Sequence, residues 1–316
     1  MAYLPTPQQL RYLVTLAETG HFGRAALACS VSQSTLSAGI LALETALDAK
    51  ILDRAVAKHP VFTPLGLELV DKARFALSAL SDVAETADAA RAPLSGPLRL
   101  GIIPTIGPFL LPRLMPALRE NYKSLRLFLR EDQSDRLLDQ LETGQLDLLI
   151  LAYPYACGEA ETLDVVRDDF LVALPPDHVL ARREAISRAD LTSEQFLLLE
   201  DGHCLRDQVL SVCGTSVRRE REQRFAATSL HTLIQMVAGG LGITLVPKLA
   251  VDAGLTKDTG VEIRRLEGAG GWRSIGLAWR AGSPRAGEYR GLAPLLAAAC
   301  TGGEKDNRVF FTRMDS

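Results

Sequence analysis

One of the five cysteines lies in a sequence that favours a reactive thiolate. Residues 201–212 predict a turn followed by a helix, with Cys204 at or near the helix N-terminus. The helix dipole and the neighbouring His203 and Arg206 favour the ionised sulfur there, whereas Asp207 opposes it. A thiolate is the form of cysteine that attacks a peroxide O–O bond and becomes a sulfenic acid. The segment therefore favours a reactive thiolate at Cys204, although the sequence fixes no pKa value.

Cys213 follows Cys204 by nine residues on the same expected helix. Nine residues of α-helix advance about 13.5 Å and place the two side chains on opposite faces. A disulfide needs Cα atoms within roughly 7 Å, so a bond between these residues would require the helix to unwind. Such a bond would act on an element with two conformations, as a redox switch requires.

The other three cysteines, Cys29, Cys157 and Cys300, have no comparable context. The cysteine count is odd and no pair has close zinc-type spacing, so neither a disulfide scaffold nor a structural metal is indicated. We expect Cys29 to be a small buried hydrophobe, Cys157 to lie in a loop open to exposure, and Cys300 to end an alanine-rich helix. No metal and no cofactor are predicted.

The chain has 316 residues and a mass of 34.2 kDa, about twice a typical domain, which predicts two or three domains. Its formal net charge is −3, which excludes a polycation that coats nucleic acid but not a small DNA-reading module. No run approaches the ~20 apolar residues of a membrane span. The first residues also lack a secretory signal. We therefore expect a cytoplasmic protein without a membrane partner.

Residues 1–63 are predicted to form a winged helix-turn-helix that reads DNA. Helical spacing after Thr6 predicts a first helix, which residues 20–22 break, and residues 24–27 predict a short second one. Ser32 is placed to cap a third helix. Two short strands around a tip at residues 57–60 then form a wing.

Polar side chains crowd the first turns of that third helix, where they reach phosphates and base edges, while Leu36, Ile40 and Leu43 face the core. Basic side chains on the wing meet phosphate or the minor groove. The candidate DNA-binding residues are Arg24, Ser32, Gln33, Ser34, Thr35, Ser37, Arg54 and Lys58. A solvated polar face is the alternative. This segment holds five Lys/Arg and four Asp/Glu, so we expect operator affinity to be modest or to depend on oligomerisation.

Residues 64–91 predict a linker dimerisation helix. Apolar residues recur with the three- and four-residue spacing of a coiled-coil seam, at Val70, Ala73, Leu77, Leu80, Ala84 and Ala87. This pattern favours pairing with a second subunit; the alternative is an amphipathic helix packed on its own domain. Proline and glycine in residues 92–97 then indicate a hinge.

Residues 98–300 alternate strand and helix, which predicts a parallel sheet with helices on its faces. Two α/β lobes are expected, lobe I from about residues 98–168 and 275–300 and lobe II from about 169–274. Two lobes with a crossing connection form a cleft, a common place for ligands. Residues 301–316 are polar and predict a flexible tail.

The motifs of the N-terminal segment resemble LysR-type transcriptional regulators. They include Phe22-Gly23-Arg24-Ala25-Ala26, Val31-Ser32-Gln33-Ser34-Thr35-Leu36-Ser37 and Phe62-Thr63-Pro64-Leu65-Gly66, with Gly240-Leu241-Gly242-Ile243 farther on. The resemblance implies an α/β multidomain protein whose two-lobed sensor is periplasmic-binding-protein-like (type 2). It also implies promoter double-stranded DNA, RNA polymerase and a homodimer or homotetramer as partners. The chain departs from the family pattern at Ser34, Gly39 and Leu41.

The sensor is similar to peroxide-sensing members of that family, on the run Gly202-His203-Cys204-Leu205-Arg206-Asp207 with Cys213 beyond it. The resemblance implies hydrogen peroxide as the signal, Cys204 as peroxidatic thiol and Cys213 as resolving thiol. It implies peroxide positioning by Thr105, Ser134, His203, Arg206 and Asp207, with Ser134 in place of the usual threonine. Arg280 is implied to couple oxidation to the lobe interface, and glutaredoxin or thioredoxin to reduce the disulfide. Residues 218–221 depart from the pattern.

Three competing functions remain open at this point. A LysR regulator could bind a small carboxylate-like effector in the cleft, with the cysteines incidental. A thiol peroxidase would merely consume peroxide, but it does not explain the helix-turn-helix, so we expect no enzyme. A solute-binding protein shares the two-lobed form but not the N-terminal unit.

Overall fold

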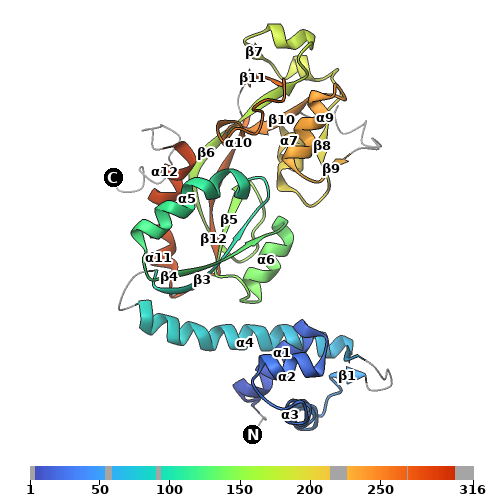
Figure 1. The fold of residues 1–316 in the computed structure, drawn as a ribbon, viewed down its shortest axis with the longest axis vertical. Helices are drawn as coiled ribbons and strands as arrows, with labels where there is room; N and C mark the ends of the chain where they lie inside the picture. The colour runs from blue at the N-terminus through green and yellow to red at the C-terminus, as the bar shows by residue number, and fades with distance from the viewer. Residues whose placement is uncertain (1–3, 54–58, 90–93, 214–225, 269, 303–316) are drawn as a thin grey trace. The chain divides into compact units, whose positions relative to one another are not determined.

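The computed structural model describes residues 4–53, 59–89, 94–213, 226–268 and 270–302, without the side chains of residues 82, 84–89 and 213. The chain divides into two compact units, one up to Asp88 that also includes Glu142–Gln145, and one with the rest of the chain from Ala89 (Figure 1). Among the described residues no single helix is long and apolar enough to cross a membrane. One pair, Phe22–Ala28 with Gln33–Leu47, meets that test only when joined across a 99° bend.

The N-terminal unit contains the predicted helix-turn-helix with a two-stranded wing. Its elements are α1 (Pro7–Thr19), α2 (Phe22–Ala28), α3 (Gln33–Leu47), β1 (Leu52–Asp53) and β2 (Val61–Phe62). Thr6 caps α1 through a capping box with Gln9, and Ser32 caps α3 by accepting from a backbone amide three residues on. The two strands pair antiparallel, while the predicted wing contacts Arg54 and Lys58 lie outside the described residues.

The core of this unit contains the residues predicted from helical spacing. Leu36, Ile40 and Leu43 of α3 are buried. Gly39 lies against the Tyr12 ring of α1, where an added Cβ would come within 2.7 Å of a ring carbon. Glycine therefore allows the close approach of α1 and α3, so the departure from the family pattern at Gly39 has a packing reason.

The helix α4 (Pro64–Ala89) forms over the range predicted for the linker. Val70 and Ala73 are buried in the core of the N-terminal unit, so this part of the predicted seam packs within its own domain. Leu77 is half-buried and Leu80 is exposed. The last two seam positions have side chains outside the described part of the chain. The prediction of a continuous intersubunit seam is thus wrong for its first two positions, and pairing through the rest stays a prediction.

The second unit has two lobes built on one long sheet with smaller pairings beside it. The strands are β3 (Gly96–Ile102), β4 (Leu125–Glu131), β5 (Leu148–Tyr153), β6 (Glu161–Leu174), β7 (Ala185–Ile186), β8 (Leu198–Leu199), β9 (Ala226–Ala227), β10 (Thr244–Pro247), β11 (Glu262–Leu266) and β12 (Trp272–Trp279). The helices are α5 (Gly107–Asn121), α6 (Ser134–Glu142), η1 (Val179–Arg182), η2 (Ala189–Leu191), α7 (Cys204–Cys213), α9 (Leu230–Ala238), α10 (Lys248–Asp252), α11 (Ala286–Gly291) and α12 (Ala293–Thr301).

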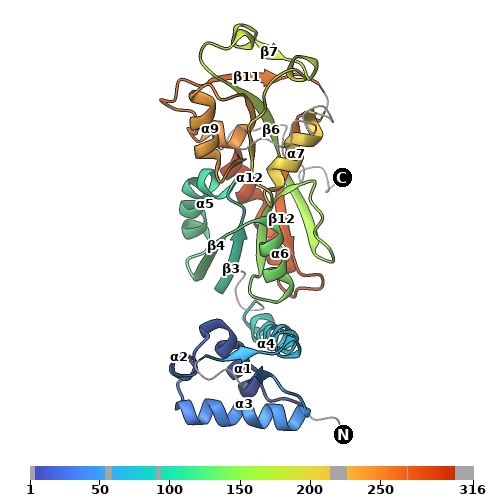
Figure 2. The ribbon, with the colours of Figure 1, turned by 90° about the vertical axis from the view of Figure 1, so that its right-hand side faces the viewer.

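The long sheet is mixed, so the prediction of a parallel sheet is correct for β3, β4 and β5 and wrong for the sheet as a whole. Its strand order is β4-β3-β5-β12-β6-β11-β7, and β10 pairs with β6. β3 is parallel to β4 and β5, but β12 is antiparallel to β5 and β6. The chain crosses from lobe I to lobe II along β6 and returns along β12, so these two strands must run in opposite directions (Figure 2).

The predicted hinge at residues 92–97 is partly strand. β3 begins at Gly96, so Gly96 and Pro97 belong to the sheet. Just before it, the buried Leu94 donates its amide to the Glu288 carboxylate on α11 at 3.1 Å. The first two hinge positions lie outside the described residues. Lobe I thus holds the chain at Leu94, directly before β3.

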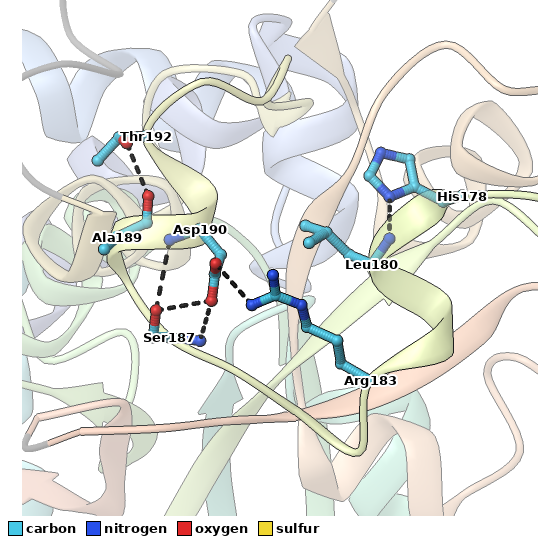
Figure 3. Close-up of polar contacts among 7 residues, drawn as sticks. All are labelled: His178, Leu180, Arg183, Ser187, Ala189, Asp190 and Thr192. Atoms are coloured by element: carbon cyan, nitrogen blue, oxygen red, sulfur yellow. Dashed lines mark hydrogen bonds and ion pairs between the residues drawn. The ribbon is translucent and has the colours of Figure 1, made fainter.

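A separate polar cluster stabilises the short elements around β7 in lobe II (Figure 3). Asp190 accepts from the amide and hydroxyl of Ser187 at 3.0 and 2.7 Å and from Arg183 at 2.7 Å. The Ser187 hydrogen bonds lower the pKa of the Asp190 carboxyl. His178 caps η1 by accepting from the Leu180 amide. These bonds close two 3₁₀ turns, which is a structural role.

Candidate redox site

Cys204 is the first residue of α7, at the helix N-terminus that the sequence predicts. Its side chain is a buried, free thiol. Two residues earlier Gly202 has φ +94°, and an added Cβ there would lie 2.6 Å from the Gln133 amide oxygen. Gln133 also donates to the Asp201 carbonyl at 3.4 Å. The turn before Cys204 therefore packs against the loop before α6 of lobe I, and both its conformation and its contacts favour glycine.

The Ser134 hydroxyl lies beside the thiol. Ser134 is the first residue of α6, it is buried, and the interaction of its hydroxyl with Cys204 lowers the pKa of that thiol against the increase that burial causes. The Leu205 backbone amide acts on that pKa in the same direction. Cys204 and Ser134 each begin a helix, and Thr105 lies two residues before α5. Helix N-termini favour negative charge, so these positions suit a thiolate and the hydroxide that leaves a peroxide.

Sequence reasoning missed a cation of this site, Arg273 on β12. Its side chain is fully buried, and its charge lowers the pKa of Cys204. The guanidinium donates from Nη1 to the Thr105 hydroxyl and from Nη2 to the Thr105 carbonyl, each at 3.0 Å. Nε donates to Asp168 Oδ2 at 3.0 Å. The only sequence signal is a charged residue at the start of an apolar strand, which is common in proteins that lack such a site.

The electrostatics of the reduced site differ from the prediction in two respects. Burial raises the pKa of the Cys204 thiol, and Arg273 and Ser134 oppose that increase only in part. Burial also lowers the pKa of His203, although the charge of Glu200 acts in the other direction. His203 is therefore neutral at neutral pH and offers a hydrogen bond rather than the positive charge expected from its position next to the thiol.

We expect the alkylation rate of Cys204 in the folded, reduced protein to keep increasing with pH beyond about 8.5, the ordinary thiol value. The reason is the direction of the pKa shift, because a thiol with a raised pKa forms its thiolate only at higher pH. The rate of reaction with iodoacetamide at Cys204, read by peptide mass spectrometry across a pH series, measures this. Urea-unfolded protein provides the reference curve. A plateau already reached at neutral pH would contradict the expectation.

Two residues predicted to position peroxide lie differently. Arg206 pairs with the Asp201 carboxylate at 2.9 Å and donates to the Leu199 carbonyl at 2.7 Å. Asp207 is exposed, and its charge raises the pKa of Cys204. The Asp201 carboxylate and the Leu199 carbonyl hold Arg206, so it is Arg273, and not Arg206, whose charge acts on the thiol.

Arg280 follows directly after β12 and binds the end of α6 that lies farther from Ser134. Its Nη1 donates to the carbonyls of Leu141 and Leu146 at 3.1 and 2.8 Å. Cations are favoured at helix C-termini, so this contact stabilises α6. Arg280 therefore touches the helix that carries Ser134 at its other end, and its coupling role stays a prediction.

The segment between β5 and β6 closes another side of the site. The Tyr155 hydroxyl donates to Asp135 on the first turn of α6. Burial raises the Tyr155 pKa, and the charges of Asp135 and Cys204 add to this. Cys157 lies in a loop, as expected, but it is buried rather than exposed and donates to the Tyr155 carbonyl at 3.5 Å. The loop folds inward because Tyr155 binds α6.

The predicted resolving residue, Cys213, is the last residue of α7, and its side chain lies outside the described part of the chain. The two cysteines thus stand at opposite ends of a continuous ten-residue helix, about 13.5 Å apart along its axis. Cys29 is half-buried beside the N-terminal core, and Cys300 is buried in α12. Residues 218–221, the departure noted in the sequence, lie outside the described residues.

The candidate DNA-binding side chains of α2 and α3 are exposed. Ser32 caps α3, and its hydroxyl lies 2.8 Å from that of Ser34 and 2.7 Å from that of Thr35. Arg24 donates to the Thr19 carbonyl at 2.7 Å. The DNA-binding candidates that the structure describes are all exposed: Arg24, Ser32, Gln33, Ser34, Thr35 and Ser37.

Comparison with known families identifies the class of protein. A model of the lysR family of bacterial regulatory helix-turn-helix proteins matches residues 7–67, and a LysR substrate binding domain model matches residues 91–300. These two matches cover the winged helix-turn-helix and the two-lobed unit. The chain belongs to the LysR family of bacterial regulatory proteins.

Its relatives include proteins named OxyR. The chain is 42% identical over 295 residues to the DNA-binding transcriptional dual regulator OxyR of Escherichia coli K12, a match that covers 93% of this chain and 96% of that protein. It is 39% identical over 295 residues to a probable hydrogen peroxide-inducible genes activator of Streptomyces viridosporus, covering 93% of this chain and 94% of that protein.

Solved structures of OxyR proteins have the same fold. A full-length OxyR cysteine-to-aspartate variant from Pseudomonas aeruginosa superposes with a TM-score of 0.79 at 34% identity, covering 98% of each chain. A cysteine-to-serine mutant of Corynebacterium glutamicum OxyR, bound to H2O2, superposes with a TM-score of 0.65 at 34% identity, covering 96% of this chain and 95% of that one.

Proposed function

We propose that the chain is a DNA-binding transcription regulator that senses hydrogen peroxide by oxidation of Cys204 and then forms a Cys204–Cys213 disulfide, so controlling antioxidant genes. One observation carries the proposal: a buried thiol stands at a helix N-terminus, where Ser134 and the charge of Arg273 both act to lower its pKa, and a second cysteine ends the same helix. The names of the OxyR relatives support the same signal.

The first chemical step is attack of the Cys204 thiolate on one peroxide oxygen. The S–O bond forms as the O–O bond breaks, giving a sulfenic acid and hydroxide. Ser134, Thr105 and neutral His203 act as hydrogen-bonding groups that place the peroxide, and Arg273 stabilises the negative charge that passes to the leaving oxygen. Burial of these groups makes each interaction stronger than it would be in water.

The second step joins the sulfenic sulfur to the Cys213 thiol and releases water. Because the two residues end a continuous helix, α7 unwinds before the bond closes. Leu205, Val209 and Val212 pack the buried side of α7, so unwinding removes apolar contacts from lobe II. The covalent bond then stabilises a refolded state that the reduced protein populates little.

The remaining features of the proposal follow from this switch. The chain works in the cytoplasm as a homodimer or homotetramer on promoter DNA, together with RNA polymerase. Arg280 transmits the conformational change that follows oxidation through α6. Glutaredoxin or thioredoxin reduces the Cys204–Cys213 disulfide and so restores the two thiols. The protein is a sensor and not an enzyme: each disulfide consumes one peroxide and then requires a reductant.

Titration with hydrogen peroxide tests the proposed function. We expect one equivalent of hydrogen peroxide to oxidise Cys204 and Cys213 together, so that the mass of the linked peptides falls by two hydrogens. The same treatment is expected to change DNA binding or transcription. Thiols that stay reduced would favour the alternative of a small effector bound between the lobes. Turnover far above one equivalent per disulfide would favour a peroxidase.

Ser134→Ala is expected to slow Cys204 oxidation by about tenfold, because a donor to the sulfur is lost while the helix keeps its length. Stopped-flow measurement of thiol loss against peroxide concentration gives the rate constant. Ser211→Ala is the matched control, since Ser211 lies on α7 and bonds only the Gln208 carbonyl in the described contacts. An unchanged rate constant in Ser134→Ala removes Ser134 from the site.

Gln33→Ala and Ser37→Ala are each expected to weaken specific DNA binding by about 1–3 kcal/mol if they contact bases. Both side chains are exposed on the first turns of α3. Fluorescence anisotropy at fixed salt, on a promoter fragment selected with the unmodified protein, measures the change. Thr45→Ala, in the last turn of α3, is the control. Wild-type affinity in both variants would support the solvated-face alternative.

A further inference from the structure

Asp168 and Arg273 form a cross-strand pair at the point where the two crossing strands leave lobe I. The two residues stand directly opposite each other in the β6–β12 register. Their side chains are 3% and 0% exposed. A buried charge without a partner is strongly unfavourable, so each group requires the other.

Both carboxylate oxygens of Asp168 are used. Oδ2 accepts from Arg273 Nε at 3.0 Å, and Oδ1 accepts from the Leu249 amide at 2.8 Å. Leu249 lies in the first turn of α10, in lobe II. The carboxylate is thus fixed at two points and cannot follow the guanidinium if Arg273 moves.

The remaining donors of Arg273 are directed at the redox site. With Nε bound to Asp168, Nη1 and Nη2 reach the hydroxyl and the carbonyl of Thr105. A guanidinium is a planar fork, so fixing Nε fixes the directions of the other N–H groups. Asp168 thereby determines where the positive charge stands relative to Thr105 and Cys204.

We propose that Asp168 is a positioning residue for the oxidation of Cys204, acting through Arg273. It holds the guanidinium where the leaving oxygen of the peroxide acquires charge, and it ties that position to α10 of lobe II. This inference rests on the proposed peroxide-sensing function. Asp168 touches neither peroxide nor sulfur in this role.

The test compares two reagents that react with the same thiol. Peroxide needs a stabilised leaving oxygen, whereas iodoacetamide needs only the thiolate. Asp168→Asn is expected to lower the high-pH plateau rate for peroxide by about tenfold or more and to change the iodoacetamide plateau by less than about twofold. A general loosening of the site would move both plateaus.

A second variant and a control sharpen the comparison. Asp168→Glu keeps the charge but moves the carboxylate by one methylene, and we expect the same selective loss toward peroxide. Asp147→Asn is the matched control, because Asp147 is another buried aspartate of this unit, bonded by Arg99. It is expected to leave both plateaus unchanged.

The double variant Asp168→Asn with Arg273→Met decides whether Asp168 acts through Arg273. We expect it to react with peroxide at the rate of Arg273→Met alone, within about twofold. Losses that multiply, or a wild-type peroxide rate in Asp168→Asn and Asp168→Glu, would overturn the inference. If the unmodified protein itself reacts slowly with peroxide, the proposed function fails instead, so the two failures are distinguishable.

Discussion

Cys204→Ser is expected to abolish the peroxide response. A serine hydroxyl is not ionised near neutral pH and does not form the sulfenic acid from which a disulfide could follow. The residue is nearly isosteric, and Cys204 is buried at the start of α7, so we expect the fold to persist. Mass spectrometry after peroxide treatment and a promoter-reporter assay before and after peroxide together measure the effect.

Cys300→Ser is the matched control for this loss, because Cys300 is also a buried cysteine but lies in α12. It is expected to keep the full response. Cys213→Ser separates the two chemical steps: sulfenic acid should still form on Cys204, without the disulfide. A peroxide response of normal size in Cys204→Ser would refute the assignment of the reactive thiol.

Arg273→Met is expected to lower the rate constant for peroxide oxidation by about 10²–10³-fold, the usual effect of removing one group that stabilises a developing oxyanion. Methionine approximates the volume of the side chain but leaves Asp168 without its buried partner, so the variant should also be less stable. Stopped-flow kinetics with peroxide give the rate, and thermal unfolding gives the stability.

The control for this arginine is Arg280→Met. Arg280 binds the Leu141 and Leu146 carbonyls, so its loss should leave the oxidation rate unchanged even where it alters transcription. Restoring stability in Arg273→Met by the second change Asp168→Asn separates folding from chemistry. Fast oxidation in that stabilised double variant would exclude Arg273 from the reaction.

The parts of the molecule that depend on neighbouring residues were predictable from sequence. Ser32 and Thr6 cap their helices as expected, and the positions of Leu36 and Cys204 followed from helical spacing and a turn signal. These features are local because a cap or a buried helix face is determined within a few residues. The linker helix predicted over residues 64–91 likewise forms over Pro64–Ala89.

The parts that depend on distant residues were not predictable. Arg273 reaches Thr105 across 168 positions of sequence, and nothing in either segment marks the contact. Arg206, which looked suitable because it neighbours the thiol, is held by Asp201 instead. The antiparallel direction of β12 was also not predicted, because it depends on how the chain returns from lobe II to lobe I. Sequence proximity indicated which helix carries the reactive residue but not which charge faces it.

The placement of both cysteines on one helix has a kinetic consequence. Under the proposed function, the sulfenic acid on Cys204 persists until α7 comes apart, and during that interval a second peroxide can convert it irreversibly to sulfinic acid. The unwinding rate of ten residues thus divides the oxidised population between a recoverable signal and permanent inactivation. A more rigid α7 would give a regulator that is lost sooner under sustained oxidant, and a looser one would give a regulator that survives it.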